Sequence, residues 1–225
     1  MRLSSHRANL HGVHNSTYRG HVTIQQGESL RDRKKRRTRA ALVGATLRLA
    51  ARKGLDQVTV EEISSAADVS TRTFFNYFAS KDEAVTGSDP EAGPRLRDRV
   101  LAQPADLSPI AALKVALLAE VSDELAEDRD VWLLRKQVIG QHPELLARVF
   151  ASGEEAERHL VAALAERSGL AVTDTFPMLL TAATGAAFRV AMARWAVVDD
   201  PPPLADLLGE ALDLLAAGLT TVPQN

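Results

Sequence analysis

A short segment in the N-terminal half carries side chains that suit the reading of DNA bases. Phe74 and Phe78 stand four residues apart, so a helix over residues 71–78 would turn both rings inward. Rotation by about 100° per residue then places a guanidinium, a hydroxyl, an aromatic ring and an amide on the outer side or its flanks. These outer residues are Arg72, Thr73, Phe75 and Asn76. Such groups meet base edges and thymine methyl groups in the major groove, so the predicted chemistry is nucleic-acid recognition.

Capping signals predict the two helices that must position these side chains. Thr59 and Glu62 form a capping box at the start of a helix over residues 60–67. Ser70 can cap the second helix, and Asp68–Val69 supplies a tight turn between the two. The sequence therefore predicts two short helices joined by a turn of about three or four residues.

Positive charge is concentrated just before this motif. A dense cationic run leads into an amphipathic helix and would add sequence-independent affinity for phosphates. The run consists of Arg31, Arg33, Lys34, Lys35, Arg36, Arg37 and Arg39. It is interpreted as a solvated arm or as a direct DNA contact, and the two are compatible. A further capping box from Ser80 to Glu83 places Lys81 where it could neutralise a phosphate.

The charge of the chain is divided unevenly between its two halves. Its 225 residues have a net charge of −2, but residues 1–99 hold 18 Lys and Arg against 11 Asp and Glu, while residues 100–225 hold 9 against 18. Net charges of +7 and −9 indicate a basic module joined to an acidic one. The absence of cysteine excludes a disulfide framework, a thiolate metal site and a cysteine nucleophile.

The spacing of prolines and of apolar residues predicts an all-α fold. Apolar residues recur three and four apart, and strand-like alternation is missing. We expect helices over residues 32–53, 60–67, 71–78, 81–87, 109–128, 131–141, 143–168, 174–198 and 203–219. Residues 91–107 are expected to form a loop or a broken continuation of the fourth helix.

Residues 47–85 resemble the DNA-binding domain of TetR-type bacterial transcriptional regulators. The shared residues are Gly54, Thr59, Val60, Ile63, Ala67, Val69, Ser70, Thr73, Phe74, Tyr77, Phe78, Ser80 and Lys81. The resemblance covers about residues 36–96 and implies a homodimer whose helix-turn-helix, over residues 59–78, reads a palindromic DNA operator. Where the family usually has glycine, this chain has Asp68, which tolerates the left-handed backbone conformation better than most residues.

The same resemblance implies roles for individual residues of the motif. The base-facing positions hold Thr71, Arg72 and Phe75, and the phosphate-facing positions hold Thr59, Thr73, Tyr77 and Lys81. Ser70 and Asn76 complete the predicted DNA-binding set. Phe75 replaces a more usual tyrosine, which favours contact with a thymine methyl group.

The chain is therefore expected to consist of a tail and two domains. Residues 1–30 are expected to be disordered, and residues 31–88 to form a three-helix DNA-binding domain. Residues 89–225 are expected to form a bundle of about five to six helices that binds a ligand and dimerises. The last two predicted helices are rich in alanine and glycine, which suits a packed bundle or a dimer seam, and we expect the homodimer to form through them.

Aromatic and apolar residues of the C-terminal half are candidates for a ligand cavity, with plain core packing as the other interpretation. They are Trp132, Phe150, Phe176, Phe188, Met192 and Trp195, with Arg135 and Arg189 to orient an anionic head group. Residues 132–140, 162–169 and 186–195 resemble C-terminal domains of regulators similar to the mycofactocin-system regulator. Members of that group respond to long-chain acyl-CoA, so this resemblance implies an elongated apolar acyl effector.

The leading hypothesis is a cytoplasmic, ligand-responsive repressor released from double-stranded DNA by a small effector. The alternatives are an activator or a ligand-independent DNA-binding regulator, and a helical enzyme with a vestigial DNA module. An enzyme needs convergent catalytic groups, but the C-terminal half has two histidines, no Gly-rich phosphate loop and no HExxH pattern. We therefore expect no catalytic residue and no cofactor.

Two further absences are expected. Six acidic residues are expected to form an exposed face without a metal, namely Glu120, Asp123, Glu124, Glu127, Asp128 and Asp130. The longest apolar stretch, residues 178–198, is interrupted by threonines and arginines, so no membrane partner is expected.

Overall fold

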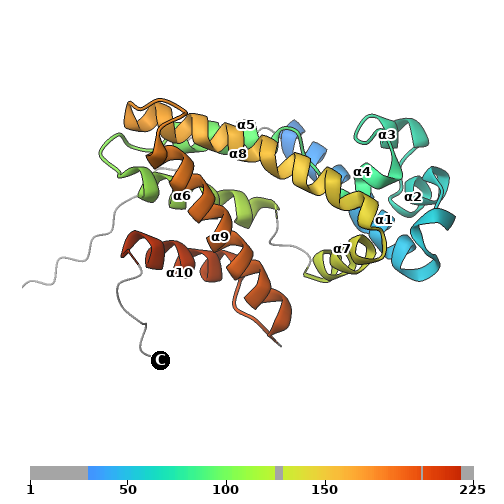
Figure 1. Cartoon of the computed structure of the whole chain (residues 1–225). Coiled ribbons are helices and arrows are strands. Elements are labelled where there is room, and N and C mark those ends of the chain that lie inside the picture. The colour runs from blue at the N-terminus through green and yellow to red at the C-terminus, as the bar shows by residue number, and fades with distance from the viewer. Residues whose placement is uncertain (1–29, 125–128, 199, 219–225) are drawn as a thin grey trace, which may run out of the picture.

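The computed structural model describes residues 30–124, 129–198 and 200–218, and every regular element in these ranges is a helix (Figure 1). The expected all-α fold is confirmed. The tail predicted over residues 1–30 lies outside the described residues, apart from Leu30.

The helices follow one another with short connections. The N-terminal part contains α1 (Leu30–Lys53), the 3-10 turn η1 (Leu55–Gln57), α2 (Val60–Ala66), α3 (Thr71–Phe75) and α4 (Lys81–Thr86). The remainder contains α5 (Ala92–Leu101), α6 (Pro109–Glu124), α7 (Arg129–Gln141), η2 (Pro143–Leu145), α8 (Leu146–Ser168), α9 (Thr175–Val197) and α10 (Leu204–Ala216). Proline opens α6, and Ser108 caps this helix by accepting the N–H of Ala111.

Residues 92–101 form a helix. Of the two structures expected for residues 91–107, a loop or a broken helix, the broken helix is the one observed. Gly87 ends α4 in the left-handed region, with φ 67°. The next helix begins at Ala92, and Pro94 lies in its first turn, where a missing N–H costs no helical hydrogen bond. The segment Gly87–Glu91, called the linker below, therefore separates α4 from α5.

The second helix of the motif is shorter than predicted. It ends at Phe75 and not at residue 78. The N–H of Asn76 is shared between the carbonyls of Arg72 and Thr73, and the N–H of Tyr77 bonds to the carbonyl of Phe74. The two i→i+3 bonds, to the carbonyls of Thr73 and Phe74, tighten the last turn at the end of the helix.

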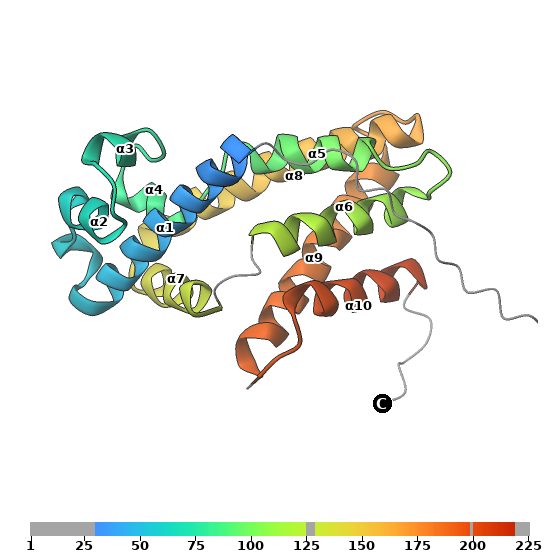
Figure 2. The same cartoon turned by 180° about the vertical axis from the view of Figure 1, so that it is seen from behind.

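The N-terminal helices enclose a buried apolar cluster that α7 helps to close. Leu42, Ile63, Phe74 and Phe78 are almost fully buried in it. The same cluster includes Val138 of α7 and, from η2, Leu145. A helix far along the chain thus packs on α1 and completes the core of the N-terminal part (Figures 1 and 2).

The other end of the molecule is a helical bundle with two apolar clusters. In one of them α5 and α8 run side by side (Figure 2), and Val100, Leu113 and Leu164 are buried between them and α6. In the other, α10 packs against both α9 and α6, around Trp195 and Leu208.

α9 is unusually apolar. In the part of the chain that the structure describes it is the one helix that passes a length and composition test for a membrane span, with mean hydropathy 1.3 and a third of the tested stretch buried. Buried core helices of water-soluble proteins pass the same test. Exposed arginines, Arg189 and Arg194, interrupt its outer side, and Arg194 pairs with Glu210 of α10 at 2.8 Å.

Candidate DNA-binding interface

Local contacts hold α2 and α3 in a helix-turn-helix. Thr59 Oγ1 accepts the N–H of Glu62 at 3.3 Å, and Glu62 Oε2 accepts the N–H of Thr59 at 2.9 Å, so the predicted capping box is confirmed. Ser70 Oγ accepts the N–H of Thr73 at 3.1 Å at the start of α3. Asp68 makes the turn between them with φ 54°, the left-handed conformation expected of it.

The capping box changes the acidity of Glu62. Lys53 Nζ lies 2.6 Å from the Glu62 carboxylate oxygens. This ammonium, together with the N–H of Thr59, holds the pKa of the Glu62 carboxyl below its ordinary value. The start of α2 is thus fastened to the end of α1 by a charge-assisted contact.

The outer face of α3 is open to solvent. Phe74 and Phe78 are 0% and 1% exposed, whereas Phe75 is 59% exposed. The face that the sequence predicts is formed by Thr71, Arg72, Phe75 and Asn76, all of them exposed, while Thr73 and Tyr77 are half-buried at its edges. The short helix therefore offers a guanidinium, a hydroxyl, an amide and an apolar ring together on one side.

Lys81 has partners that the sequence did not reveal. Its ammonium donates to the carbonyls of Leu55, Asp56 and Val58, at 2.8, 3.1 and 3.2 Å. An ammonium has three protons, so these bonds engage all of them and fasten α4 to η1. The phosphate contact implied by the family resemblance stays a prediction, because it would require Lys81 to release one of these carbonyls.

The cationic run lies on the first turns of α1. Arg33, Lys34, Lys35 and Arg37 are exposed, and Arg36 and Arg39 are half-buried. The structure thus divides the run into side chains free to meet a phosphate backbone and side chains that pack against the protein.

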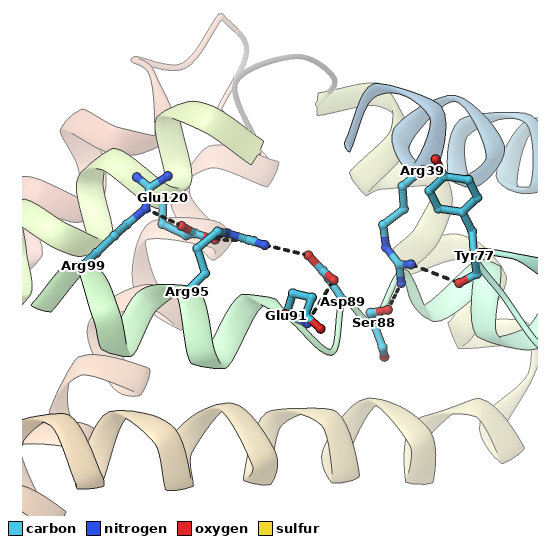
Figure 3. Close-up of polar contacts among 8 residues, drawn as sticks. All are labelled: Arg39, Tyr77, Ser88, Asp89, Glu91, Arg95, Arg99 and Glu120. Atoms are coloured by element: carbon cyan, nitrogen blue, oxygen red, sulfur yellow. Dashed lines mark hydrogen bonds and ion pairs between the residues drawn. The ribbon is translucent and has the colours of Figure 1, made fainter. Parts of the chain in front are cut away.

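Arg39 packs where α3, α4 and the linker meet. It donates to the carbonyl of Tyr77 at 3.1 Å and to the carbonyl of Ser88 (Figure 3), and its guanidinium lies 4.2 Å from the centre of the Phe78 ring. The Arg39 side chain, from α1, therefore joins the C-terminal end of α3 to the linker. The sequence carries no signal for this role, because both acceptors are main-chain groups.

Arg135 of α7 reaches the same region from the other side. Its Nε donates to the carbonyl of Val85 at 3.1 Å, and a Cβ added to Gly87 would collide with its guanidinium. Burial lowers the pKa of the Arg135 guanidinium, and the charge of Arg39 lowers it further. The sequence suggested Arg135 as a ligand-pocket residue, whereas here its head group contacts the end of α4.

A second polar group joins the linker to the bundle. Asp89 Oδ2 lies 3.0 Å from Arg95 Nη1, and Arg95 also bonds to Glu120 Oε1 at 2.5 Å through Nη2 and at 2.9 Å through Nε (Figure 3). Arg99 Nε lies 3.1 Å from the other oxygen of Glu120. Glu120 was expected on an exposed acidic face, and that was wrong. It is 7% exposed, because two arginines of α5 draw it inward.

Of the five other residues of the expected acidic face, the structure describes the side chain of one. Asp130 is exposed, and the side chains of the remaining four lie outside the described residues. Among the residues that the structure describes, no group of three His, Asp or Glu side chains could hold a metal ion.

The residues suggested for a ligand pocket do not all lie together. Four belong to the apolar cluster of α6, α9 and α10, namely Trp132, Phe188, Met192 and Trp195, and the two tryptophan rings are 6.2 Å apart. Phe150, Phe176 and Arg189 are exposed elsewhere on the bundle, Phe150 to 69%. The predicted ligand pocket stays a prediction. Of the residues suggested for it, these four aromatic and apolar side chains are the ones that lie in one cluster.

An open helix-turn-helix face beside a cationic helix, carried by a separate helical bundle, defines a DNA-binding transcriptional regulator. Residues 42–85 match the family model of the bacterial regulatory proteins of the tetR family, and residues 107–220 match that of the MftR C-terminal domain. The chain belongs to the TetR family.

Individual relatives agree with this assignment. The chain is 33% identical over 175 residues to the HTH-type transcriptional regulator TcmR of Streptomyces glaucescens, covering 75% of this chain and 77% of that protein. It is 30% identical over 201 residues to MftR of Mycobacterium tuberculosis, named for transcriptional regulation of mycofactocin biosynthesis, covering 88% and 98% of the two chains.

Among solved structures, the fatty acid degradation regulator FadR of Bacillus halodurans is similar, with a TM-score of 0.54 over 82% of this chain and 97% of that one. At 20% identity this likeness shows the fold alone. TcmR and MftR are both named as regulators of transcription.

Proposed function

We propose that this regulator is a ligand-responsive repressor that binds a palindromic operator as a homodimer. The observation that carries the proposal is the open face of α3, held in place by caps at both helices of the motif. Exposed cations on the first turns of α1 lie in the same part of the molecule and would add affinity for phosphates.

The residues of the motif divide by their chemistry. Arg72 and Asn76 can hydrogen-bond to base edges, Thr71 can do so through its hydroxyl, and Phe75 can contact a thymine methyl group. The hydroxyls and main-chain groups around the caps face the phosphates in this proposal, and they belong to Thr59, Ser70, Thr73 and Tyr77. Lys81 would join them by releasing one of the three carbonyls that its ammonium now contacts.

The dimer would form through α9 and α10. Leu179, Val190 and Val197 are 64%, 54% and 80% exposed and recur along one side of α9. Ala182, Ala186 and Ala193 lie exposed on the same side and would let a second helix approach closely. A second copy would cover this apolar stripe, which water would otherwise contact.

We propose residues 31–88 as the DNA-binding domain and residues 89–225 as the ligand-binding and dimerisation domain. α7 serves both, because it completes the N-terminal core while Trp132 packs in the bundle. As a repressor of transcription the protein would act in the cytoplasm.

The effector in this proposal is an elongated apolar molecule of acyl type. The apolar cluster around Trp132 and Trp195 is the candidate for its site, and the match to the MftR C-terminal domain supports the choice. The dimer without effector would hold two recognition helices about 34 Å apart, one turn of DNA. An effector that binds the released geometry more tightly would shift the population away from DNA.

Fluorescence anisotropy with DNA from the gene's own upstream region tests the proposal. The dimer should bind this DNA more tightly than a scrambled duplex, and a footprint should show two related half-sites. Folded dimeric protein that binds neither duplex at low salt would overturn the proposal.

Release by an effector needs its own measurement. Palmitoyl-CoA should raise the melting temperature and release the DNA, whereas coenzyme A alone should do neither. A rise in melting temperature without release would leave an acyl-binding protein that is not an inducible repressor.

A further inference from the structure

We propose that a chain of polar contacts through the linker sets the position of the recognition helix α3 relative to the bundle. The contacts run from Tyr77 through Arg39 to Ser88, and from the neighbouring Asp89 through Arg95 to Glu120 (Figure 3). Asp89, Arg95, Arg99 and Glu120 are called the linker cluster below. The inference rests on the proposed function, since it concerns how a DNA-binding face is positioned.

The covalent connection alone is a poor candidate for this task. α4 and α5 are separate helices, and the left-handed Gly87 interrupts the helical hydrogen bonds between them. A continuous helix would pass a movement on as a rigid rod, but a non-helical segment bends at its backbone dihedrals. The packing of α7 on α1 and side-chain contacts across the linker therefore fix the angle between its two ends.

At the recognition end, Arg39 supplies that fixation. It bonds to the carbonyls of Tyr77 and Ser88 and rests on the Phe78 ring. Tyr77 comes two residues after the end of α3, so a movement of the linker at Ser88 is passed directly to the last turn of that helix.

At the end of the linker that faces the bundle, the linker cluster fixes the position of the chain. The Glu120 side chain is 9% exposed, and those of Arg95 and Asp89 are 23% and 17% exposed. Charges this far out of water are costly to separate, so the arginines and the carboxylates move together. Asp89 also accepts the N–H of Glu91 at 3.1 Å, which fixes its orientation within the linker.

The far side of α6 faces the proposed effector site. Val121, next to Glu120, is buried in the apolar cluster that contains Met192 and Trp195, and Leu117 packs against the same cluster. A molecule that pushes α6 away from α10, on which it packs, would also move Glu120, and the linker cluster would carry the movement to the linker. Glu120 is thus a positioning residue for DNA recognition, although it lies outside the helix-turn-helix.

Hydrogen exchange of the full chain tests this coupling without DNA or effector. Glu120→Gln keeps the size of the side chain and removes its charge. We expect amide exchange over residues 76–91 to be faster by about 5- to 150-fold, the range of ordinary coupling between sites. Asp98→Asn, on the same helix α5 but at an exposed side chain, is the matched control and should leave these amides unchanged.

Asp89→Asn keeps the test decisive if Glu120→Gln fails to fold. It breaks the contact with Arg95 but leaves Glu120 paired with both arginines and still offers an oxygen to Glu91. Because coupling is reciprocal, it should speed exchange in residues 115–121 of α6, and it should weaken binding to the upstream DNA by a similar factor.

Faster exchange in Glu120→Gln confined to α5 and α6, with residues 76–91 as in the wild type, would overturn the inference. So would Asp89→Asn with unchanged α6 exchange and DNA affinity. Failure of the proposed function would show differently, as wild-type protein that binds no DNA while the exchange results stand.

Discussion

Arg72 is the side chain on which sequence-specific binding should depend most. It is exposed on α3 with its guanidinium free to reach a guanine edge. Arg72→Ala should weaken binding to the upstream DNA by about 1–3 kcal/mol and leave binding to scrambled DNA almost unchanged. Anisotropy titrations at one salt concentration measure both. Arg158→Ala, on the exposed side of α8, removes the same charge and should change neither. Equal weakening on both duplexes would show that Arg72 reads no bases.

Glu62 should make the stability of the N-terminal part depend on pH. Its folded-state pKa is lowered chiefly by the hydrogen bond from Lys53, then by the N–H of Thr59. The ionised carboxylate therefore stabilises the fold above the ordinary glutamate pKa of about 4.3, and this contribution disappears as the pH falls through the folded value. Urea unfolding between neutral and acid pH should show a shallower pH dependence for Glu62→Gln than for the wild type. Glu61→Gln removes the same charge one position earlier and should follow the wild-type curve, and parallel curves for all three would contradict the prediction.

Contacts between residues close together in the sequence could be predicted, whereas contacts between residues far apart in the sequence could not. The capping box of Thr59, the cap at Ser70 and the turn at Asp68 each depend on residues within four positions. Arg39 and Lys81 instead bond to carbonyls 38 and 26 residues away. Every residue has a carbonyl, so the sequence gives no sign of which one a cation will reach.

The left-handed turn between α2 and α3 restricts which residues can occupy position 68. Asp68 has φ 54°, where a β-branched side chain is strained. Asp68→Val should lower the free energy of unfolding by about 1–2 kcal/mol, whereas Asp68→Gly should stay close to the wild type. Urea denaturation of the three proteins measures the difference. Similar destabilisation of both variants would point to the carboxylate and not to the backbone conformation.

The first turns of α1 should set the salt dependence of DNA binding. Replacing four of the five exposed cations of the run by glutamine removes charges that could neutralise phosphates while keeping the half-buried Arg36 and Arg39, which pack against the protein. The four are Arg33, Lys34, Lys35 and Arg37, and Arg31 is retained. The slope of log affinity against log salt should become shallower by about 0.9 for each phosphate that the variant no longer neutralises. Anisotropy at several salt concentrations gives the slope, and an unchanged slope would remove these residues from the interface.

Element boundaries followed the sequence where capping residues mark them. α2, α6 and α9 begin within one residue of their predicted positions. The sequence could not decide whether α5 forms, because the prolines of residues 90–104 favour a loop as much as a first helical turn. The packing of α7 on α1 could not be predicted, because an apolar helix face does not identify the surface that will cover it.

The proposed dimer depends on the apolar stripe of α9. Val190 lies 54% exposed in the apolar stripe of α9. Val190→Asp should leave a monomer and abolish binding to the palindrome, because a buried charge without a partner opposes the contact between copies. Val172→Asp, at 55% exposure beyond the end of α8, is the matched control and should remain a dimer. Light scattering after size-exclusion chromatography distinguishes the two, and a dimeric Val190→Asp would place the interface elsewhere.

The basic and acidic parts of the sequence lie in different parts of the folded chain. The basic surplus lies largely with α1 and the helix-turn-helix, at one end of an elongated molecule, and the acidic surplus belongs to the bundle (Figure 1). Such a distribution orients the molecule toward a polyanion during approach. The sequence predicted the two charges but not that part of the acidic side, Glu120, is used internally.

The core shared by α1 and α7 limits how this protein can be re-engineered as a biosensor. Val138 and Leu145 complete the apolar cluster around Leu42 and Phe78, although they come after α5 and α6 in the chain. A chimera joined at the linker would combine an N-terminal half from one parent with an α7 from another, and the mismatch would fall in the middle of that cluster. Exchange of sensing modules between relatives therefore requires the graft to carry matched α1 and α7 surfaces.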